Sequence, residues 1–126
     1  MPDPFAHTVL AVPDVARTLA AYRQLGFTGT PPHLAEGMAA VQQGTTTLFV
    51  LQPEHAFRQQ YPQASRPLGA TATITITGLP NFDHVATRIR AHAEVITDHT
   101  DDPSYRVIVF RDLNGYILAI SDTPPS

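Results

Sequence analysis

The chain has 126 residues, a formal net charge of −3 and 43% hydrophobic residues, which fits one compact domain or two small paired modules. It contains no cysteine and no lysine, which excludes disulfides, thiolate metal sites, Schiff-base chemistry and the lysine of a phosphate-binding loop. The eight basic residues are scattered, so nucleic-acid binding is not expected. No apolar run approaches the roughly 20 residues of a membrane helix, and residues 1–4 do not resemble a signal peptide, so we expect a cytoplasmic protein.

The chain opens with a predicted strand and helix. Residues 5–12 are mostly apolar and indicate a buried strand. Asp14 is suited to cap a helix over residues 14–25, because its carboxylate can accept hydrogen bonds from the first unpaired amides. Gly26 is typical of the left-handed residue that ends a helix, and Phe27 can then fold back onto the last turn.

A hairpin and a proline-rich connector are predicted next. Residues 38–43 and 45–51 indicate two strands that turn around Gly44. Residues 53–69 differ in composition, because they combine prolines with a short helical stretch. Two aromatic side chains lie one helical turn apart within this stretch, and they are Phe57 and Tyr61.

The second half begins with a strand and a helix, as the first half does. Residues 71–77 alternate threonine with alanine or isoleucine, the pattern of a half-buried strand that has one hydroxyl-rich face. Asn81 is placed to cap the helix that follows. The apolar stripe of that helix consists of Phe82, Val85 and Ile89.

Three strands are predicted at the end of the chain. Residues 94–99 form the first, and residues 105–111 and 116–121 form a hairpin in which Asn114-Gly115 favours a two-residue type I′ turn. Each half therefore consists of a strand, a helix and three strands, which predicts an α+β fold of two tandem βαβββ modules. Within a single domain over residues 1–126, the predicted parts are module 1 (about 5–52), a connector (53–69) and module 2 (about 70–122).

Two sequence stretches carry a family resemblance. One is His7-Thr8-Val9-Leu10-Ala11-Val12-Pro13-Asp14, which leads to Tyr22 and Leu25-Gly26-Phe27, and the other is the closing Phe110-Arg111-Asp112-Leu113-Asn114-Gly115-Tyr116-Ile117-Leu118-Ala119-Ile120. In this order the motifs resemble the vicinal oxygen chelate superfamily, which includes glyoxalase I, extradiol dioxygenases, fosfomycin-resistance enzymes and bleomycin-resistance proteins. The resemblance spans nearly the whole chain. It implies curled sheets around a cleft, a small-molecule ligand and a homodimer.

The resemblance also implies where a metal ion would bind. In the metalloenzymes of this superfamily four ligands line the cleft, one from an early and one from a late strand of each module. The corresponding positions in this chain hold His7, Leu48, Thr71 and Ala119. Leucine, alanine and a neutral threonine hydroxyl do not supply the charged donors that hold a divalent ion, so we predict no metal and no other cofactor.

Several residues are candidates for the cleft, each with an alternative interpretation. His7 either lines the cleft, as a hydrogen-bond donor or as the one remaining metal-ligand residue, or forms a hydrogen bond with the backbone at a strand start. The hydroxyls of Thr73 and Thr75 either face a ligand or simply suit a strand. Phe57 and Tyr61 either cover the mouth of the cleft, or lie at a dimer seam, or pack in the core.

The charged residues of the second half also allow more than one interpretation. Arg111 can reach a ligand carboxylate with its planar fork, or it can pair with Asp112 or Asp98. The run of residues 98–102 is interpreted as a solvated acidic loop rather than a metal cluster. No residue is assigned a catalytic role. The predicted cleft comprises His7, Leu48, Val50, Thr71, Thr73, Thr75, Phe57, Tyr61, Arg111 and Ala119.

We expect a metal-independent small-molecule-binding protein, similar to the bleomycin-resistance proteins, which confer antibiotic resistance by sequestration. The Arg111-Asp112-x-x-Gly115 arrangement resembles the closing motif of that branch. The alternative is a metal-dependent enzyme, either a glyoxalase-like lyase or isomerase or a dioxygenase, which would need further donors such as Glu36 and Glu54. A third hypothesis is a protein-interaction or regulatory module that uses the cleft for a partner, and an exposed apolar strip on residues 53–69 would favour it.

Overall fold

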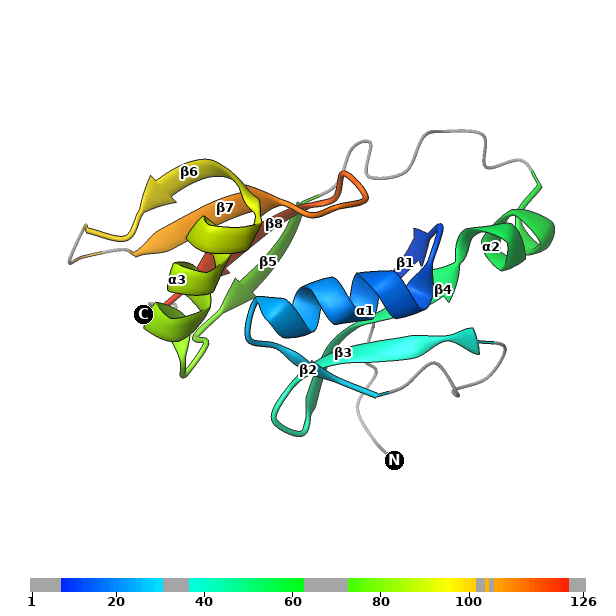
Figure 1. Ribbon diagram of the computed structural model, residues 1–126, viewed down its shortest axis with the longest axis horizontal. Helices are drawn as coiled ribbons and strands as arrows, with labels where there is room; N and C mark the ends of the chain where they lie inside the picture. The colour runs from blue at the N-terminus through cyan, green and yellow to red at the C-terminus, as the bar shows by residue number, and fades with distance from the viewer. Residues whose placement is uncertain (1–7, 31–36, 63–72, 102–103, 105, 123–126) are drawn as a thin grey trace, which may run out of the picture. The chain divides into compact units, whose positions relative to one another are not determined.

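The computed structural model describes residues 8–30, 37–62, 73–101, 104 and 106–122. These residues form two compact units, each built on a four-stranded mixed sheet (Figure 1). The strand order is β1-β4-β3-β2 in the first unit and β5-β8-β7-β6 in the second, so both sheets have the same topology. This arrangement confirms the predicted α+β fold of two βαβββ modules.

The first unit has two helices and a sheet in which one strand pair is parallel. Its elements are β1 (Val9–Val12), α1 (Val15–Gln24), β2 (Thr28–Gly29), β3 (Ala39–Gln43), β4 (Thr46–Pro53) and α2 (Glu54–Gln60). β1 is parallel to β4, whereas β3 is antiparallel to both β4 and β2. The predicted hairpin is confirmed, because Gln43 pairs with Thr46 across a two-residue turn that contains Gly44.

The second unit repeats this pattern with one helix. Its elements are β5 (Thr73–Thr77), α3 (Phe82–His92), β6 (Glu94–His99), β7 (Val107–Arg111) and β8 (Ile117–Ser121). β5 is parallel to β8, and β7 is antiparallel to both β8 and β6. The predicted beginnings of the two parallel strands, residues 5–7 and 71–72, lie outside the described residues. None of the described helices is both long and apolar enough to span a bilayer.

Both predicted ends of the first helix are confirmed. The backbone N–H of Arg17 donates a hydrogen bond to Asp14 Oδ1 at 3.0 Å, which satisfies one of the free amides of the first turn. Gly26 has a φ of 99°, a left-handed conformation that costs glycine little. Phe27 then folds back, since its N–H donates to the carbonyl of Tyr22 at 3.2 Å and the two rings meet edge to face.

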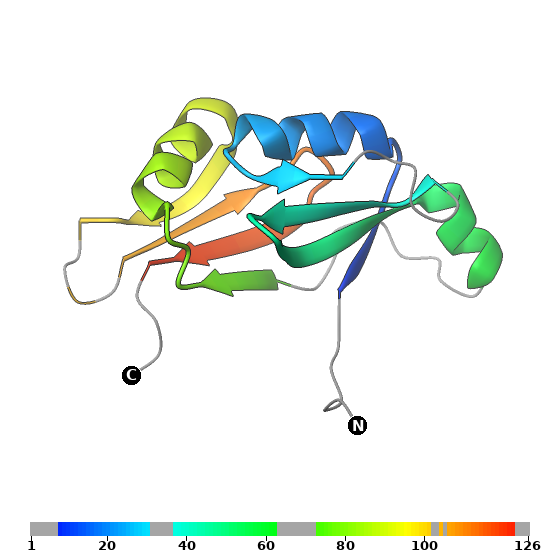
Figure 2. The ribbon, with the colours of Figure 1, turned by 90° about the horizontal axis from the view of Figure 1, so that it is seen from below.

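The core of the first unit lies between α1 and one face of its sheet (Figure 2). The fully buried ring of Tyr22 on α1 meets the fully buried ring of Phe49 on β4, with centroids 5.2 Å apart. Leu51 is also fully buried, two residues along the same strand. Because side chains alternate along a strand, Val50 and Gln52 lie on the opposite face of the sheet.

The core of the second unit has the same plan. Phe82, Val85 and Ile89 on α3 are buried, as the predicted apolar stripe requires. Along β5, Ile76 is buried whereas the flanking threonines are exposed, so the predicted alternation of this strand is confirmed. The other buried side chains come from β7 and β8, and they are Ile108, Phe110, Leu118 and Ile120.

Two predicted local structures differ in detail. Asn81 precedes α3 as expected, but its side chain makes no capping hydrogen bond to the helix. The final hairpin does not have a two-residue turn. Asp112 instead pairs with Tyr116 across a three-residue loop in which Gly115 has a φ of 93°, the position where such loops need a left-handed residue.

Candidate binding site

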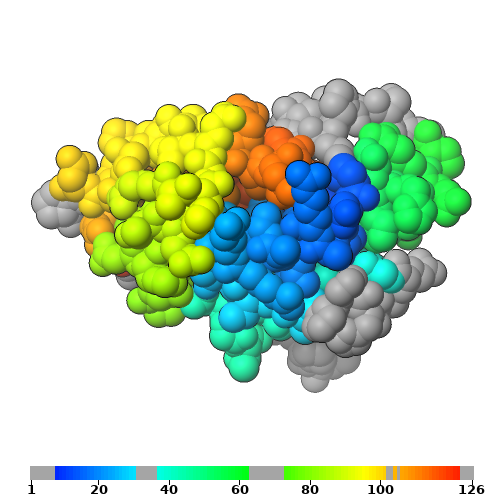
Figure 3. Space-filling view, viewed as in Figure 1, coloured from blue at the N-terminus to red at the C-terminus, as the bar shows by residue number. Residues whose placement is uncertain are grey.

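A pocket lies in the first unit, between α2 and the face of the sheet opposite α1. α2 packs against β4 and β1 on this face, and segments of β1 and α2 are neighbours at the surface (Figure 3). The pocket has a volume of about 340 Å³, near the lower end of the range for sites that hold small organic molecules. Its lining residues are Val9, Met38, Gln52, Phe57, Gln60 and Tyr61.

The walls of this pocket are mainly apolar. Val9 of β1 and Met38, which precedes β3, contribute aliphatic and thioether surface. Phe57 and Tyr61 lie four residues apart at the end of α2, which places them on one side of the helix. Their ring centroids are 5.2 Å apart, with 52° between the ring planes. These rings provide a surface on which a planar ligand can pack.

The polar part of the pocket is a pair of glutamines. Gln52 is a polar residue, but it follows a run of apolar residues in β4 and is only 9% exposed. Its Nε2 group donates to Gln60 Oε1 at 3.3 Å, so the side chain of α2 reaches the strand. None of the lining residues that the structure describes is charged, which favours an uncharged ligand.

The predicted cleft residues of the first half lie on this same side of the sheet. Phe57 and Tyr61 both line the pocket. Val50 is half-buried beside Val9, its partner in the parallel register, and Leu48 lies farther along the same face of β4. His7 lies outside the described residues.

The predicted cleft residues of the second half lie on the face of its sheet opposite α3. Thr75 is the register partner of Ala119, and Thr73 that of Ile117, which in turn pairs with Arg111. The structure therefore brings four of the predicted residues onto one face of the second unit. Thr71 lies outside the described residues.

Arg111 forms an ion pair with Glu94, and not with Asp112 or Asp98, the two partners considered from the sequence. Its Nε atom lies 3.1 Å from Glu94 Oε2, because β6 and β7 place these residues opposite each other. Asp112 instead organises the hairpin loop, where its Oδ1 accepts the N–H groups of Asn114 and Tyr116, each at 2.9 Å. The aspartate of the closing motif therefore has a structural role in this chain.

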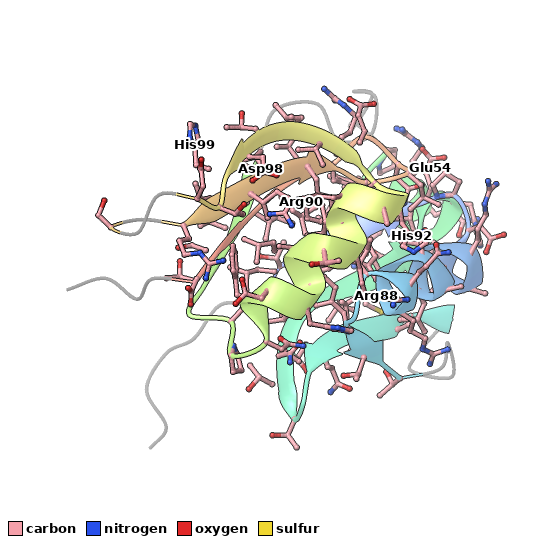
Figure 4. The ribbon with its side chains drawn as sticks, turned by 60° about the vertical axis from the view of Figure 1, so that its left-hand side comes forward. Glu54, Arg88, Arg90, His92, Asp98 and His99 are labelled. Atoms are coloured by element: carbon pink, nitrogen blue, oxygen red, sulfur yellow. The ribbon has the colours of Figure 1, made fainter. Side chains whose placement is uncertain are left out.

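Asp98 forms hydrogen bonds with neighbouring side chains. The Nε group of Arg90 donates to it at 2.7 Å, and the Thr100 hydroxyl donates at 2.6 Å. Figure 4 shows Arg90 on α3 next to Asp98, with His99 directed away. These hydrogen bonds hold the pKa of Asp98 well below its ordinary value of 3.8, and the bond from Arg90 has the largest effect.

The described residues do not fit the metal site of the superfamily. Leu48 has no donor atom, and Ala119 lies between Thr75 and Val109 in the sheet register, so neither neighbour supplies an imidazole or a carboxylate. Across the described parts of the chain, no group of three or more histidines and carboxylates is arranged to hold an ion. The residues at these two positions are therefore unsuited to a divalent metal.

Four lining residues were not among the predicted cleft residues. Val9 and Met38 look like ordinary apolar residues, so the sequence offers no signal for them. Gln52 has a detectable one, because a polar residue at the end of a buried strand needs a partner. Gln60 directly precedes Tyr61, but its contact with β4 depends on how α2 folds back.

No family model and no curated protein matches the sequence, but solved structures do. A hypothetical protein from S. aureus is 19% identical with a TM-score of 0.76, and the match covers 98% of this chain and 96% of that one. A glyoxalase/bleomycin resistance protein/dioxygenase family enzyme from Burkholderia phytofirmans PsJN is 16% identical with a TM-score of 0.67, covering 91% and 94%. The fosfomycin resistance protein FosX from Mesorhizobium loti is 12% identical with a TM-score of 0.64, covering 98% and 95%. The chain thus has the fold of the vicinal oxygen chelate superfamily.

Proposed function

We propose that the protein binds a small, uncharged organic molecule in the pocket of its first unit, without a metal ion. The observation that carries this proposal is the composition of the pocket, in which two aromatic side chains line the wall together with the buried Gln52 and its exposed partner Gln60. Apolar walls with a few placed polar groups are typical of small-molecule sites. The aliphatic residues at two of the superfamily's ligand positions support a function that needs no metal.

Sequestration is the role that this pocket supports best. Among the described lining residues Tyr61 alone has an ionisable side chain, so these residues do not form the acid–base pair or activated nucleophile of a catalytic site. A bleomycin-resistance-type protein needs no such groups, because holding a compound keeps it from its target. The small volume and uncharged lining favour a compact neutral compound over a large cationic antibiotic.

We also propose that the chain assembles as a homodimer, which the resemblance to the superfamily implies. The subunit mass measured by native mass spectrometry tests this assembly directly, and any bound metal or organic compound adds to the same mass. A species with twice the mass of 13.7 kDa supports the dimer, and a monomer at micromolar concentration contradicts it.

The binding proposal is tested with N-phenyl-1-naphthylamine, a neutral aromatic probe that fluoresces in apolar surroundings. The protein has no tryptophan, so the probe signal is free of indole background. We expect saturable binding that dialysis against EDTA does not change. Phe57→Ala should weaken this binding at least tenfold, because it removes one aromatic wall.

Leu113→Ala is the matched control, because it truncates an apolar side chain that is 47% exposed in the hairpin loop of the second unit. It should leave the affinity unchanged. Equal losses for both variants, or binding that disappears with EDTA and returns with a divalent metal, would overturn the proposal.

A further inference from the structure

The glutamine pair indicates the chemical class of the ligand. We propose that the pocket selects a neutral, planar compound that contains a lactam, a cyclic amide whose N–H and C=O groups lie side by side. This inference rests on the proposed function, since it names what the same pocket binds. It is carried by the hydrogen bond between Gln52 and Gln60, both of which line the pocket.

Beyond their mutual hydrogen bond, the two amides present one unpaired carbonyl oxygen and one unpaired NH₂ group to a ligand. Each glutamine amide has an NH₂ group and a carbonyl oxygen. Because Gln52 Nε2 donates to Gln60 Oε1, the Gln52 carbonyl and the Gln60 NH₂ group have no hydrogen-bond partner among the described residues. A lactam has the complementary pair, since its N–H can donate to the carbonyl and its C=O can accept from the NH₂ group.

This complementarity does not depend on how the amides are oriented. If both side chains rotate by 180°, Gln60 donates to Gln52, and the free groups become the Gln52 NH₂ and the Gln60 carbonyl. The pair again offers an NH₂ group beside a carbonyl oxygen, and a lactam turned over in the pocket meets both. A ligand with only an acceptor leaves one glutamine group without its partner in either orientation.

The burial of Gln52 makes this recognition selective. Its side chain is 9% exposed, so a bound ligand that fails to pair with its amide also shields that amide from water. An unpaired buried polar group lowers affinity, and sites built around such groups reject analogues that lack the matching atom. The rings of Phe57 and Tyr61 provide the apolar surface for the body of a planar ligand.

The test compares 2-quinolone, a bicyclic lactam, with N-methyl-2-quinolone, which lacks the N–H donor. Titration calorimetry on the full chain should show at least tenfold weaker binding of the N-methyl compound. The steric control is 4-methyl-2-quinolone, which keeps the donor and carries a methyl group elsewhere, and it should bind like the parent lactam.

Variants then assign the preference to the glutamines. Gln52→Leu and Gln60→Leu should each bring the two affinities to within about threefold, because an aliphatic side chain of similar size can neither donate nor accept. Gln59→Leu is the matched control, since Gln59 is an exposed neighbour on α2 outside the pocket lining, and it should keep the full preference. Thermal melting of each variant confirms that it is folded.

The outcomes separate this inference from the proposed function. If N-phenyl-1-naphthylamine binds and depends on Phe57, but both quinolones bind equally, the lactam inference is overturned and the binding function stands. If Gln52→Leu keeps the preference for the N–H compound, the inference is also overturned. If the naphthylamine probe does not bind in a way that depends on Phe57, the proposed function itself is wrong.

Discussion

The two units share a topology and an apolar core between helix and sheet, but the second unit adds charged contacts to this core. In the first unit the contact between α1 and β4 is aromatic, with the Tyr22 ring edge-on to Phe49. In the second unit Arg106 adds a charged connection, because its guanidinium donates to Asp83 on α3 and, at 3.1 Å, to Asp122 after β8. The same guanidinium lies 5.0 Å from the centre of the Phe82 ring. The second unit therefore combines an apolar core with a charged connection between helix and sheet.

The units also differ on the face of the sheet opposite the long helix. In the first unit α2 packs on that face and closes a pocket with β1 and β4. In the second unit the described residues place no helix there, and the threonines of β5 are exposed. The candidate site therefore depends on the helix that the first unit adds to the shared strands.

The aromatic connection of the first unit should have the largest effect on stability. Phe49→Ala removes a fully buried ring that packs against Tyr22. We expect it to lower the free energy of unfolding by about 3–5 kcal/mol, measured by chemical denaturation. A loss below about 1 kcal/mol would contradict the role assigned to this ring.

The hairpin loop of the second unit should have the next largest effect. Asp112→Ala leaves two backbone N–H groups without their acceptor, which should cost about 1–3 kcal/mol in unfolding free energy. Asp112→Asn keeps a carbonyl oxygen and should recover most of this loss. If alanine is tolerated as well as asparagine, the closing motif does not organise the loop.

The charged contacts of the second unit should make stability depend on pH. The pKa of Asp98 in the folded protein is below its ordinary value of 3.8, chiefly because Arg90 donates to it. The resulting stabilisation is fully present above about pH 5 and is lost as the pH falls below about 4. Between about pH 5 and pH 3, the Tm of the Asp98→Asn variant should therefore fall less than the Tm of the wild-type protein.

The control for this pH effect is Asp101→Asn, because Asp101 is exposed and forms no ion pair with a described residue. This variant should follow the wild-type melting curve at each pH. A pH dependence of Asp98→Asn that is identical to that of the wild type would show that the contact with Arg90 contributes nothing to acid sensitivity.

The smallest effect is expected on the exposed face of the second sheet. Thr75→Ala should change unfolding free energy by less than about 0.5 kcal/mol, because the side chain is exposed. It should also leave the affinity for N-phenyl-1-naphthylamine within twofold of wild type. Strong loss of probe binding would move the site to the second unit and reverse the comparison.

Local signals explain how much of the fold could be predicted. The cap at Asp14 and the left-handed Gly26 determine the ends of α1 through neighbouring atoms, so the sequence is sufficient there. The Asn114-Gly115 prediction was wrong in turn type because the side chain of Asp112 binds two loop amides, a contact that the dipeptide alone does not indicate.

The candidate site was less accessible to prediction. Phe57 and Tyr61 could be singled out as an aromatic pair, but their position at a pocket wall depends on how α2 folds back onto β4. The contact between Gln52 and Gln60 likewise joins residues of two different elements. Sequence periodicity predicts which face of a helix or strand is apolar, but not which element covers it.

NMR titration of the full chain with 2-quinolone tests most directly whether the ligand binds in the pocket of the first unit, because it reports on both units at once. We expect the largest shift changes in the side-chain amide signals of Gln52 and Gln60 and in the methyl signal of Met38, all of which line the pocket. The signals of β5 and β8 should change little. Changes centred instead on Thr73, Thr75 and Ala119 would place the site on the second unit and contradict the account.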